Sequence, residues 1–165
     1  MDSSQPVRRW ATSNLGSLGF VLALLVALIH LFHPQRGLFR LVLLVRSGNA
    51  SLLVTDPRPV AFVLSAIAIL LGIQLVVADV ARKRVYLLGM ALMATYFVGY
   101  FTWHLSGHGG FLPGRKPLYH GLHPLEAVVS HLVDSSLAAV AKLAEATLFI
   151  VLSALYRRES YERQR

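Results

Sequence analysis

The sequence predicts an all-α integral membrane protein, with a single membrane domain over residues 1–165 that forms a four-helix bundle. The composition favours this class, because 55% of the residues are hydrophobic, only 15% are charged and the mean hydropathy is +0.58. Soluble domains carry about 25% charged residues. The runs 15–33, 59–78 and 85–104 contain no Asp, Glu, Lys or Arg, and a bilayer core needs roughly 20 apolar residues as helix. We therefore assign membrane helices to 15–33, 59–79 and 85–104.

A fourth apolar segment, 125–156, is predicted to form one long helix whose membrane part is about 136–156. The tyrosine and two arginines at 156–158 are typical of an interfacial anchor, and roughly 20 residues before them complete a span. Residues 157–165 then form a cytoplasmic tail. Unlike the other three, this segment carries acidic and basic side chains along its length. Its Asp, Glu, Lys and His residues are Glu126, His131, Asp134, Lys142 and Glu145.

The distribution of basic residues predicts the orientation of the chain. Four spans place both termini on one side, and that side has nine Lys and Arg residues, against six on the other. Cytoplasmic segments carry the excess of Lys and Arg, so we expect a plasma-membrane protein with both termini cytoplasmic. The net charge of +8 then flanks the spans and faces anionic headgroups, which argues against nucleic acid as a partner. The nine are Arg8, Arg9, Arg82, Lys83, Arg84, Arg157, Arg158, Arg163 and Arg165.

The two outer loops differ in character. Residues 34–58 contain an apolar run with Arg36 and Arg40 one turn apart, which favours a short helix lying in the membrane interface. A small hairpin around the turn-like triplet Ser47-Gly48-Asn49 is the alternative. Residues 105–124 are rich in His, Gly and Pro and predict an irregular loop.

Under this topology all seven histidines lie on the outer side. Imidazole is the commonest metal ligand, and His with carboxylate suits zinc, copper, iron or nickel. A haem or transition-metal site is therefore one interpretation of the cluster, and histidines that simply tolerate the interface are the other. The chain has no cysteine, so thiolate ligands are excluded. The candidate metal ligands are His104, His108, His123, His131 and Asp134.

Two polar stripes are predicted to face each other inside the membrane. Tyr96 and Tyr100 lie on one face with the histidine at 104, because these residues recur every four positions. Lys142 and Glu145 are three residues apart on the fourth helix, and Glu145 and Tyr96 should both lie near the midplane. Polar residues in lipid turn inward, so the stripes could form a polar column. The Lys–Glu pair is either a structural ion pair or a device for proton handling.

The sequence contains no complete catalytic motif, so no catalytic residue is assigned and the question of an enzyme stays open. We expect first a noncatalytic subunit or scaffold of a membrane complex. The alternatives are a metal- or haem-binding protein that handles electrons or metal through its outer histidines, and a carrier of protons or small solutes that uses Lys142 and Glu145. The expected partners are the lipid bilayer and either other membrane subunits or further copies of this chain.

Overall fold

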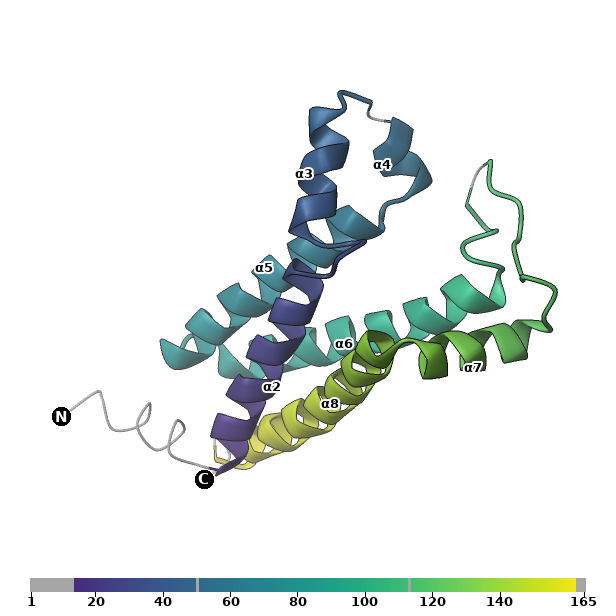
Figure 1. Cartoon of the computed structure of the whole chain (residues 1–165). Coiled ribbons are helices and arrows are strands. Elements are labelled where there is room, and N and C mark those ends of the chain that lie inside the picture. The colour runs from purple at the N-terminus through teal and green to yellow at the C-terminus, as the bar shows by residue number, and fades with distance from the viewer. Residues whose placement is uncertain (1–13, 50, 113, 163–165) are drawn as a thin grey trace.

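The computed structural model describes residues 14–49, 51–112 and 114–162, and within these ranges the chain is helical and contains no strand (Figure 1). Sequence features that fall on residues 1–13 and 163–165, including the Arg8-Arg9 pair, lie outside the described residues. The helices are α2 (Asn14–Leu31), α3 (Leu38–Arg46), α4 (Ser51–Thr55), α5 (Arg58–Val77), α6 (Arg82–Leu105), α7 (Pro124–Asp134) and α8 (Ser136–Glu162).

Four of the helices, α2, α5, α6 and α8, are long and apolar enough to cross a membrane. They contain 18, 20, 24 and 27 residues, and roughly 20 are needed. Large apolar side chains such as Leu88 and Ile150 lie mostly exposed on their outer surfaces, which is the pattern of a surface solvated by lipid. These observations are compatible with the predicted multi-pass membrane protein.

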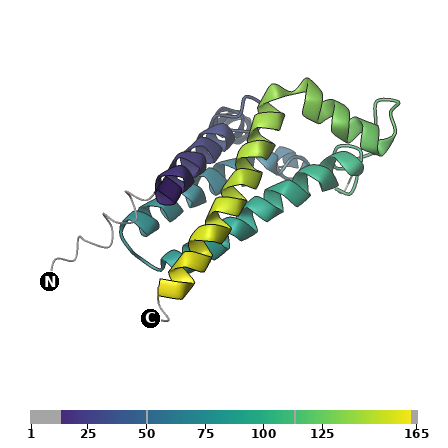
Figure 2. The ribbon, with the colours of Figure 1, turned by 90° about the horizontal axis from the view of Figure 1, so that it is seen from below.

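The four long helices pack on one another through small residues and an apolar interior. Helix α6 lies along α8, α2 contacts both α5 and α8, and α5 also contacts α6 (Figures 1 and 2). A Cβ added to Gly89 of α6 would come within 2.8 Å of Leu152 Cδ1 of α8, so the glycine permits this close approach. The interior residues include Val26, Met93 and Leu148.

Both ends of this set of helices are distinct. We call the end at Leu31, Arg58, Leu105 and Ser136 the histidine end. There α3 and α4 follow α2, while the loop 106–123 and α7 follow α6, and Figure 1 shows these two groups extending on separate sides of the fold. At the opposite end, a short turn over residues 78–81 connects α5 with α6, and Arg82 forms an ion pair with Asp79 of this turn at 3.0 Å.

Among its described residues, the first loop (34–58) contains two short helices and not the hairpin that was the alternative prediction. Residues 38–46 form α3 and residues 51–55 form α4. Ser47 ends α3 by donating its hydroxyl hydrogen to the Leu44 carbonyl, and Asn49 accepts hydrogen bonds from the Ser51 backbone and hydroxyl. The turn-like triplet therefore separates two helices and does not connect two strands.

The prediction of one continuous helix over 125–156 is wrong. The helix is interrupted at Ser135, which has an extended backbone (φ −110°, ψ 96°). The Ser135 hydroxyl accepts a hydrogen bond from the Ala138 backbone amide, which is how an N-cap residue satisfies the first turn of a new helix. Helix α8 therefore begins at Ser136 and continues to Glu162, so most of the predicted tail 157–165 is helical, and α7 is a separate helix at the end of α6.

The other helix boundaries shift by up to three residues from those expected. Helix α2 ends at Leu31, so His33 lies beyond it, and α5 ends at Val77. Helix α6 begins at Arg82 and extends to Leu105. The irregular loop rich in His, Gly and Pro accordingly occupies 106–123.

Candidate metal centre at the histidine end

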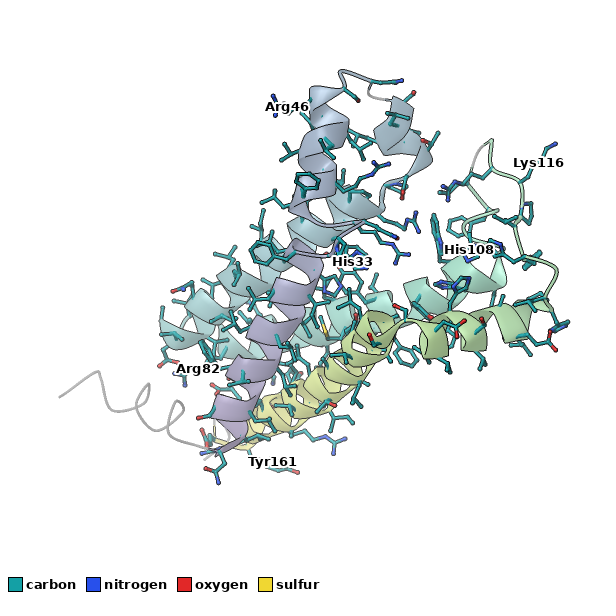
Figure 3. All side chains as sticks on the ribbon, viewed as in Figure 1. His33, Arg46, Arg82, His108, Lys116 and Tyr161 are labelled. Carbon is teal, nitrogen blue, oxygen red and sulfur yellow. The ribbon has the colours of Figure 1, made fainter. Side chains whose placement is uncertain are left out.

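A cavity of about 610 Å³ opens at the histidine end, between the ends of α2 and α5 on one side and α6 with α7 on the other. This volume is within the range of roughly 300–1,000 Å³ that is usual for ligand sites. Figure 3 shows His33 and His108 on the two sides of this region. The lining includes four histidines on or near α6 and α7, a histidine after α2, two aromatic residues and four cationic side chains: His104, His108, His120, His131, His33, Tyr100, Trp103, Arg36, Arg58, Arg115 and Lys116.

Three of these histidines converge on one point. One ring nitrogen from each of His104, His108 and His131 lies within 4.8 Å of the other two. His108 Nε2 and His131 Nε2 are 2.9 Å apart, and the His104 and His131 rings have centroids 5.1 Å apart. The cluster therefore joins the end of α6, the loop that follows it and the last turn of α7.

Backbone hydrogen bonds fix the orientation of two of the rings. His104 Nδ1 lies 2.8 Å from the Tyr100 carbonyl oxygen, and His108 Nδ1 lies 2.9 Å from the Leu118 carbonyl oxygen. A carbonyl can only accept, so both Nδ1 atoms must carry the hydrogen. In the neutral ring this leaves Nε2 with a free lone pair. Metal-binding histidines are commonly oriented in this way, by a carbonyl that accepts from the ring nitrogen facing away from the metal.

The loop around His108 is held in an unusual backbone conformation. Gly107, His108 and Gly109 have φ values of +66°, +58° and +83°, and a non-glycine residue seldom adopts this region. A Cβ added to Gly109 would lie 2.6 Å from the Trp103 ring, and one added to Gly107 would lie 2.6 Å from the Leu118 backbone nitrogen. The two glycines therefore let the loop fold back over the end of α6, which returns His108 to His104 although the helix has ended.

The triad fits a single metal ion better than a haem. Nitrogen atoms bound to a tetrahedral ion at 2.0–2.1 Å lie about 3.3 Å apart, so the widest pair, at 4.8 Å or less, needs to close by about 1.5 Å. Axial nitrogens on opposite sides of a haem iron would be about 4 Å apart with the porphyrin between them. His108 Nε2 and His131 Nε2 lie at 2.9 Å, which is too close for that arrangement.

Two of the predicted ligands lie elsewhere. His123 is the N-cap of α7, where its Nδ1 accepts from the Leu125 backbone amide at 3.4 Å and its own amide donates to Glu126 at 3.1 Å. Asp134 accepts a hydrogen bond from the Ser130 hydroxyl at 2.7 Å. Neither belongs to the metal-ligand group that the described residues form.

One histidine near the triad was not among the predicted ligands. The His120 ring centroid lies 5.1 Å from that of His108 and 5.9 Å from that of His131. His120 has a left-handed backbone with φ of +53°, which turns it toward the cavity. The sequence offered only its place in the loop, because a non-glycine residue gives no local signal for a positive φ.

The cavity carries strong positive charge. Arg58 makes two hydrogen bonds to Asp56, at 2.6 and 2.8 Å, and although burial opposes ionisation, these bonds and the charge of Arg58 lower the pKa of Asp56. Burial, followed by the charge of Arg58, lowers the pKa of Arg36 to about 10. Burial and the charges of Arg36 and Arg58 lower the pKa of His33 to about 4.

The same physical causes act on His108. Burial lowers the pKa of its imidazole, and the neighbouring His131 and His120 lower it further. His108 is therefore neutral below the usual histidine pKa, and a neutral imidazole is the form that binds a metal ion.

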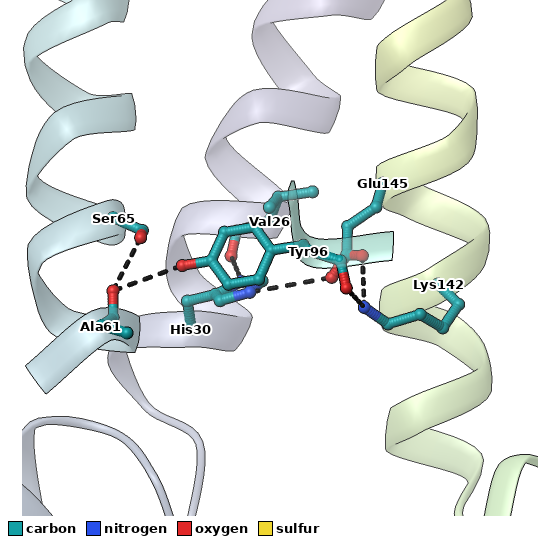
Figure 4. A network of polar contacts seen from close by, with 7 residues as sticks. All are labelled: Val26, His30, Ala61, Ser65, Tyr96, Lys142 and Glu145. Atoms are coloured by element: carbon teal, nitrogen blue, oxygen red, sulfur yellow. Dashed lines mark hydrogen bonds and ion pairs between the residues drawn. The ribbon is translucent and has the colours of Figure 1, made fainter. Parts of the chain in front are cut away.

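A second polar network lies deeper among the helices (Figure 4). Lys142 forms an ion pair with Glu145 and donates to the Tyr96 carbonyl at 3.4 Å. On the other side of Glu145, His30 Nε2 lies 3.7 Å from Oε1. The Tyr96 hydroxyl donates to the Ala61 carbonyl at 3.3 Å. The network thus ties α2, α5, α6 and α8 together at one level.

The two polar stripes meet through aromatic contacts. Lys142 Nζ lies 5.3 Å from the centroid of the Tyr100 ring, and this ring is 4.2 Å from the His104 ring. Sequence reasoning identified Lys142, Glu145 and the tyrosines, but it did not connect His30 with Glu145. The partner depends on how α2 is rotated against α8, which periodicity along a single helix does not determine.

Searches against family models, curated proteins and solved structures returned no match to this chain.

Proposed function

We propose that this is a multi-pass membrane protein that binds one first-row transition-metal ion through His104, His108 and His131. The observation that carries the proposal is the convergence of three imidazole nitrogens within 4.8 Å. Two of the rings are also oriented by backbone carbonyls so that Nε2 is the unprotonated nitrogen of the neutral ring. Three histidines with an open fourth position form the ligand set of catalytic zinc sites, so the ion retains a place for water or another ligand.

In this proposal, α2, α5, α6 and α8 form the predicted four-helix bundle in the plasma membrane, and α3 lies at its interface. Both termini are cytoplasmic, and the metal site opens on the outer side. The orientation follows from the excess of Lys and Arg near the opposite end. Because the chain has no native cysteine, Ser47→Cys and Tyr161→Cys each introduce one exposed thiol at opposite ends. An impermeant maleimide applied to intact cells should label the first variant and not the second.

The metal proposal is tested on purified protein in mild detergent. Zinc should bind with one ion per chain, and Co²⁺ substituted for it should give a visible d–d spectrum of a tetrahedral site. His108→Ala and His131→Ala should abolish stoichiometric binding. His123→Asn is the matched control, because it removes an imidazole from the same loop region and keeps a residue that can cap α7. Equal zinc binding by the wild type and His108→Ala would refute the site.

The other two roles make different predictions. A noncatalytic subunit would retain a stable partner, either another subunit or a second copy of this chain, after alanine replaces His108. A carrier would move protons or solute across liposomes, and Glu145→Gln would stop the flux. The described core argues against a continuous polar path, because the buried residues of its two clusters are apolar apart from Tyr86.

A further inference from the structure

The cavity beside the histidine triad contains an unusual excess of hydrogen-bond donors. Its lining includes the side chains of Arg36, Arg58, Arg115 and Lys116, and among the described residues it includes no Asp or Glu. Arg and Lys side chains donate and do not accept. A ligand that fits this lining must therefore present acceptors, and preferably negative charge.

Only part of this charge is neutralised by the described residues. Arg58 is paired with Asp56, but no described carboxylate forms an ion pair with Arg36, Arg115 or Lys116. Arg36 is half-buried, and burial together with the charge of Arg58 lowers its pKa to about 10, although Asp56 acts in the opposite direction. Burial disfavours the charged form of a side chain, and an anion in the cavity would offset this penalty.

Two further donors are buried without a partner. The Trp103 indole nitrogen and the Tyr100 hydroxyl are inaccessible, and neither has a hydrogen-bond partner among the described residues. Trp103 is only 8% exposed, and two guanidinium groups lie near its ring, Arg58 at 3.9 Å and Arg115 at 5.0 Å from the ring centroid. A buried polar group without a partner costs about 1–3 kcal/mol. Because both residues line the cavity, a rotation of either side chain would bring its donor to an acceptor bound there and offset that cost.

We propose that this cavity binds a phosphate group, held by Arg36, Arg115 and Lys116 and by hydrogen bonds from the buried aromatic donors. A tetrahedral phosphate offers several acceptor oxygens and negative charge, which matches a lining of guanidinium, ammonium, indole and phenol groups. The cavity of about 610 Å³ is large enough for a phosphate that carries an organic group. This anion site goes beyond the metal site and does not require it.

The two sites nevertheless support each other in a way that rests on the proposed function. Three neutral imidazoles bring no negative charge to a divalent ion. The positive charges of the arginines in the cavity repel that ion. A phosphate oxygen in the open fourth position would supply the missing negative charge. Coupling between two ligands is reciprocal, so phosphate should strengthen zinc binding by the same factor by which zinc strengthens phosphate binding.

The phosphate has two sources that share this chemistry, a soluble phosphate compound and the headgroup of a membrane lipid. The test therefore has two arms, both on chelator-treated full-length protein. Calorimetry with inorganic phosphate measures soluble binding. Native mass spectrometry of protein from nanodiscs that contain phosphatidic acid in phosphatidylcholine measures retention of the lipid. Binding in the first arm alone indicates a soluble ligand, and retention of phosphatidic acid indicates a lipid ligand; either result supports the site.

The variants make the result specific. Arg36→Gln should weaken phosphate binding by about tenfold or more, as expected for a charged hydrogen-bond donor. Arg40→Gln is the matched control, because it removes the same charge one turn away from an exposed position outside the cavity lining. Trp103→Phe keeps an aromatic ring and removes the indole donor, and it should weaken binding by a smaller factor.

The anion and metal proposals fail separately in this design. Phosphate binding that survives in chelator-treated His108→Ala supports the cationic site whatever zinc does. Absence of binding in both arms for the wild type would overturn the anion site, and so would equal weakening by Arg36→Gln and Arg40→Gln. The melting temperature of each variant shows whether a loss of phosphate binding comes from unfolding of the protein.

Discussion

Removal of one partner from the Lys142–Glu145 ion pair should destabilise the protein strongly, whereas removal of both should not. Glu145 is 1% exposed and the Lys142 side chain is 14% exposed, so each charge depends on the other for compensation. Breaking a buried pair costs about 3–5 kcal/mol. The same principle indicates that a well-packed apolar pair is often as stable as the ion pair.

The two single variants should lose different amounts of unfolding free energy. Lys142→Met leaves a carboxylate that is almost fully buried beside Tyr96 and His30, so its cost should be near the upper end, about 5 kcal/mol. Glu145→Leu leaves an ammonium group that can turn toward the Tyr100 ring and the cavity, so its cost should be nearer to about 3 kcal/mol. The double variant should lie within about 1 kcal/mol of the wild type.

The assay is reversible unfolding in mixed micelles at pH 7, with helicity followed by circular dichroism as the denaturing detergent is increased. Leu143→Met is the control, because Leu143 is on the same helix and 71% exposed. Single variants whose free energy of unfolding lies within about 1 kcal/mol of the wild-type value would refute the reasoning. Such a result would mean that the two side chains are neutral, so that removing one leaves no unpaired charge. A double variant as unstable as the sum of the two would show that packing, and not charge, carries the effect.

Three further predictions concern stability. Burial and two nearby arginines lower the pKa of His33 to about 4, so the unfolded state binds the proton first, and stability should fall as the pH drops from about 6.5 toward 4. His33→Gln should flatten this part of the pH profile of unfolding. Gly109→Ala should destabilise the protein by about 1–2 kcal/mol or more, because φ is +83° and the Cβ would meet Trp103 at 2.6 Å; a melting curve with and without zinc measures it. Gly89→Leu should lower the melting temperature because it separates α6 from α8, whereas Gly99→Leu, at a position with no neighbour within 4 Å, should leave it unchanged.

The long apolar helices could be predicted from the sequence because the signal is a simple one. A run of about 20 apolar residues without Asp, Glu, Lys or Arg matches the thickness of a bilayer core, and three such runs in so short a chain leave too few residues to cover them in water. The break at Ser135 could not be predicted in the same way. Serine is tolerated within helices and also caps them, and the choice is made by its hydrogen bond to Ala138.

The location of the candidate site could be predicted from the sequence, but the residues that form it could not. Topology places the histidines at one end, yet it does not distinguish the ones that converge from the ones that cap or face solvent. His108 joins the triad through left-handed backbone and close glycine contacts, and His123 leaves it because its ring caps α7. Both outcomes depend on loop geometry that follows from tertiary packing.

The interior is largely apolar on one side of Glu145 and more polar on the other, and this difference has an electrical consequence. From Glu145 to the opposite end the core consists of two clusters that include Ile69, Leu148, Val151 and Leu155, whereas the other half holds the cavity and the polar network. In the proposed topology, water and ions that enter the cavity would bring the potential of the outer solution inward, so most of the voltage across the membrane would fall over the apolar half. A charge bound at the histidine triad would cross little of that field, whereas the Lys142–Glu145 pair lies close to where the field begins.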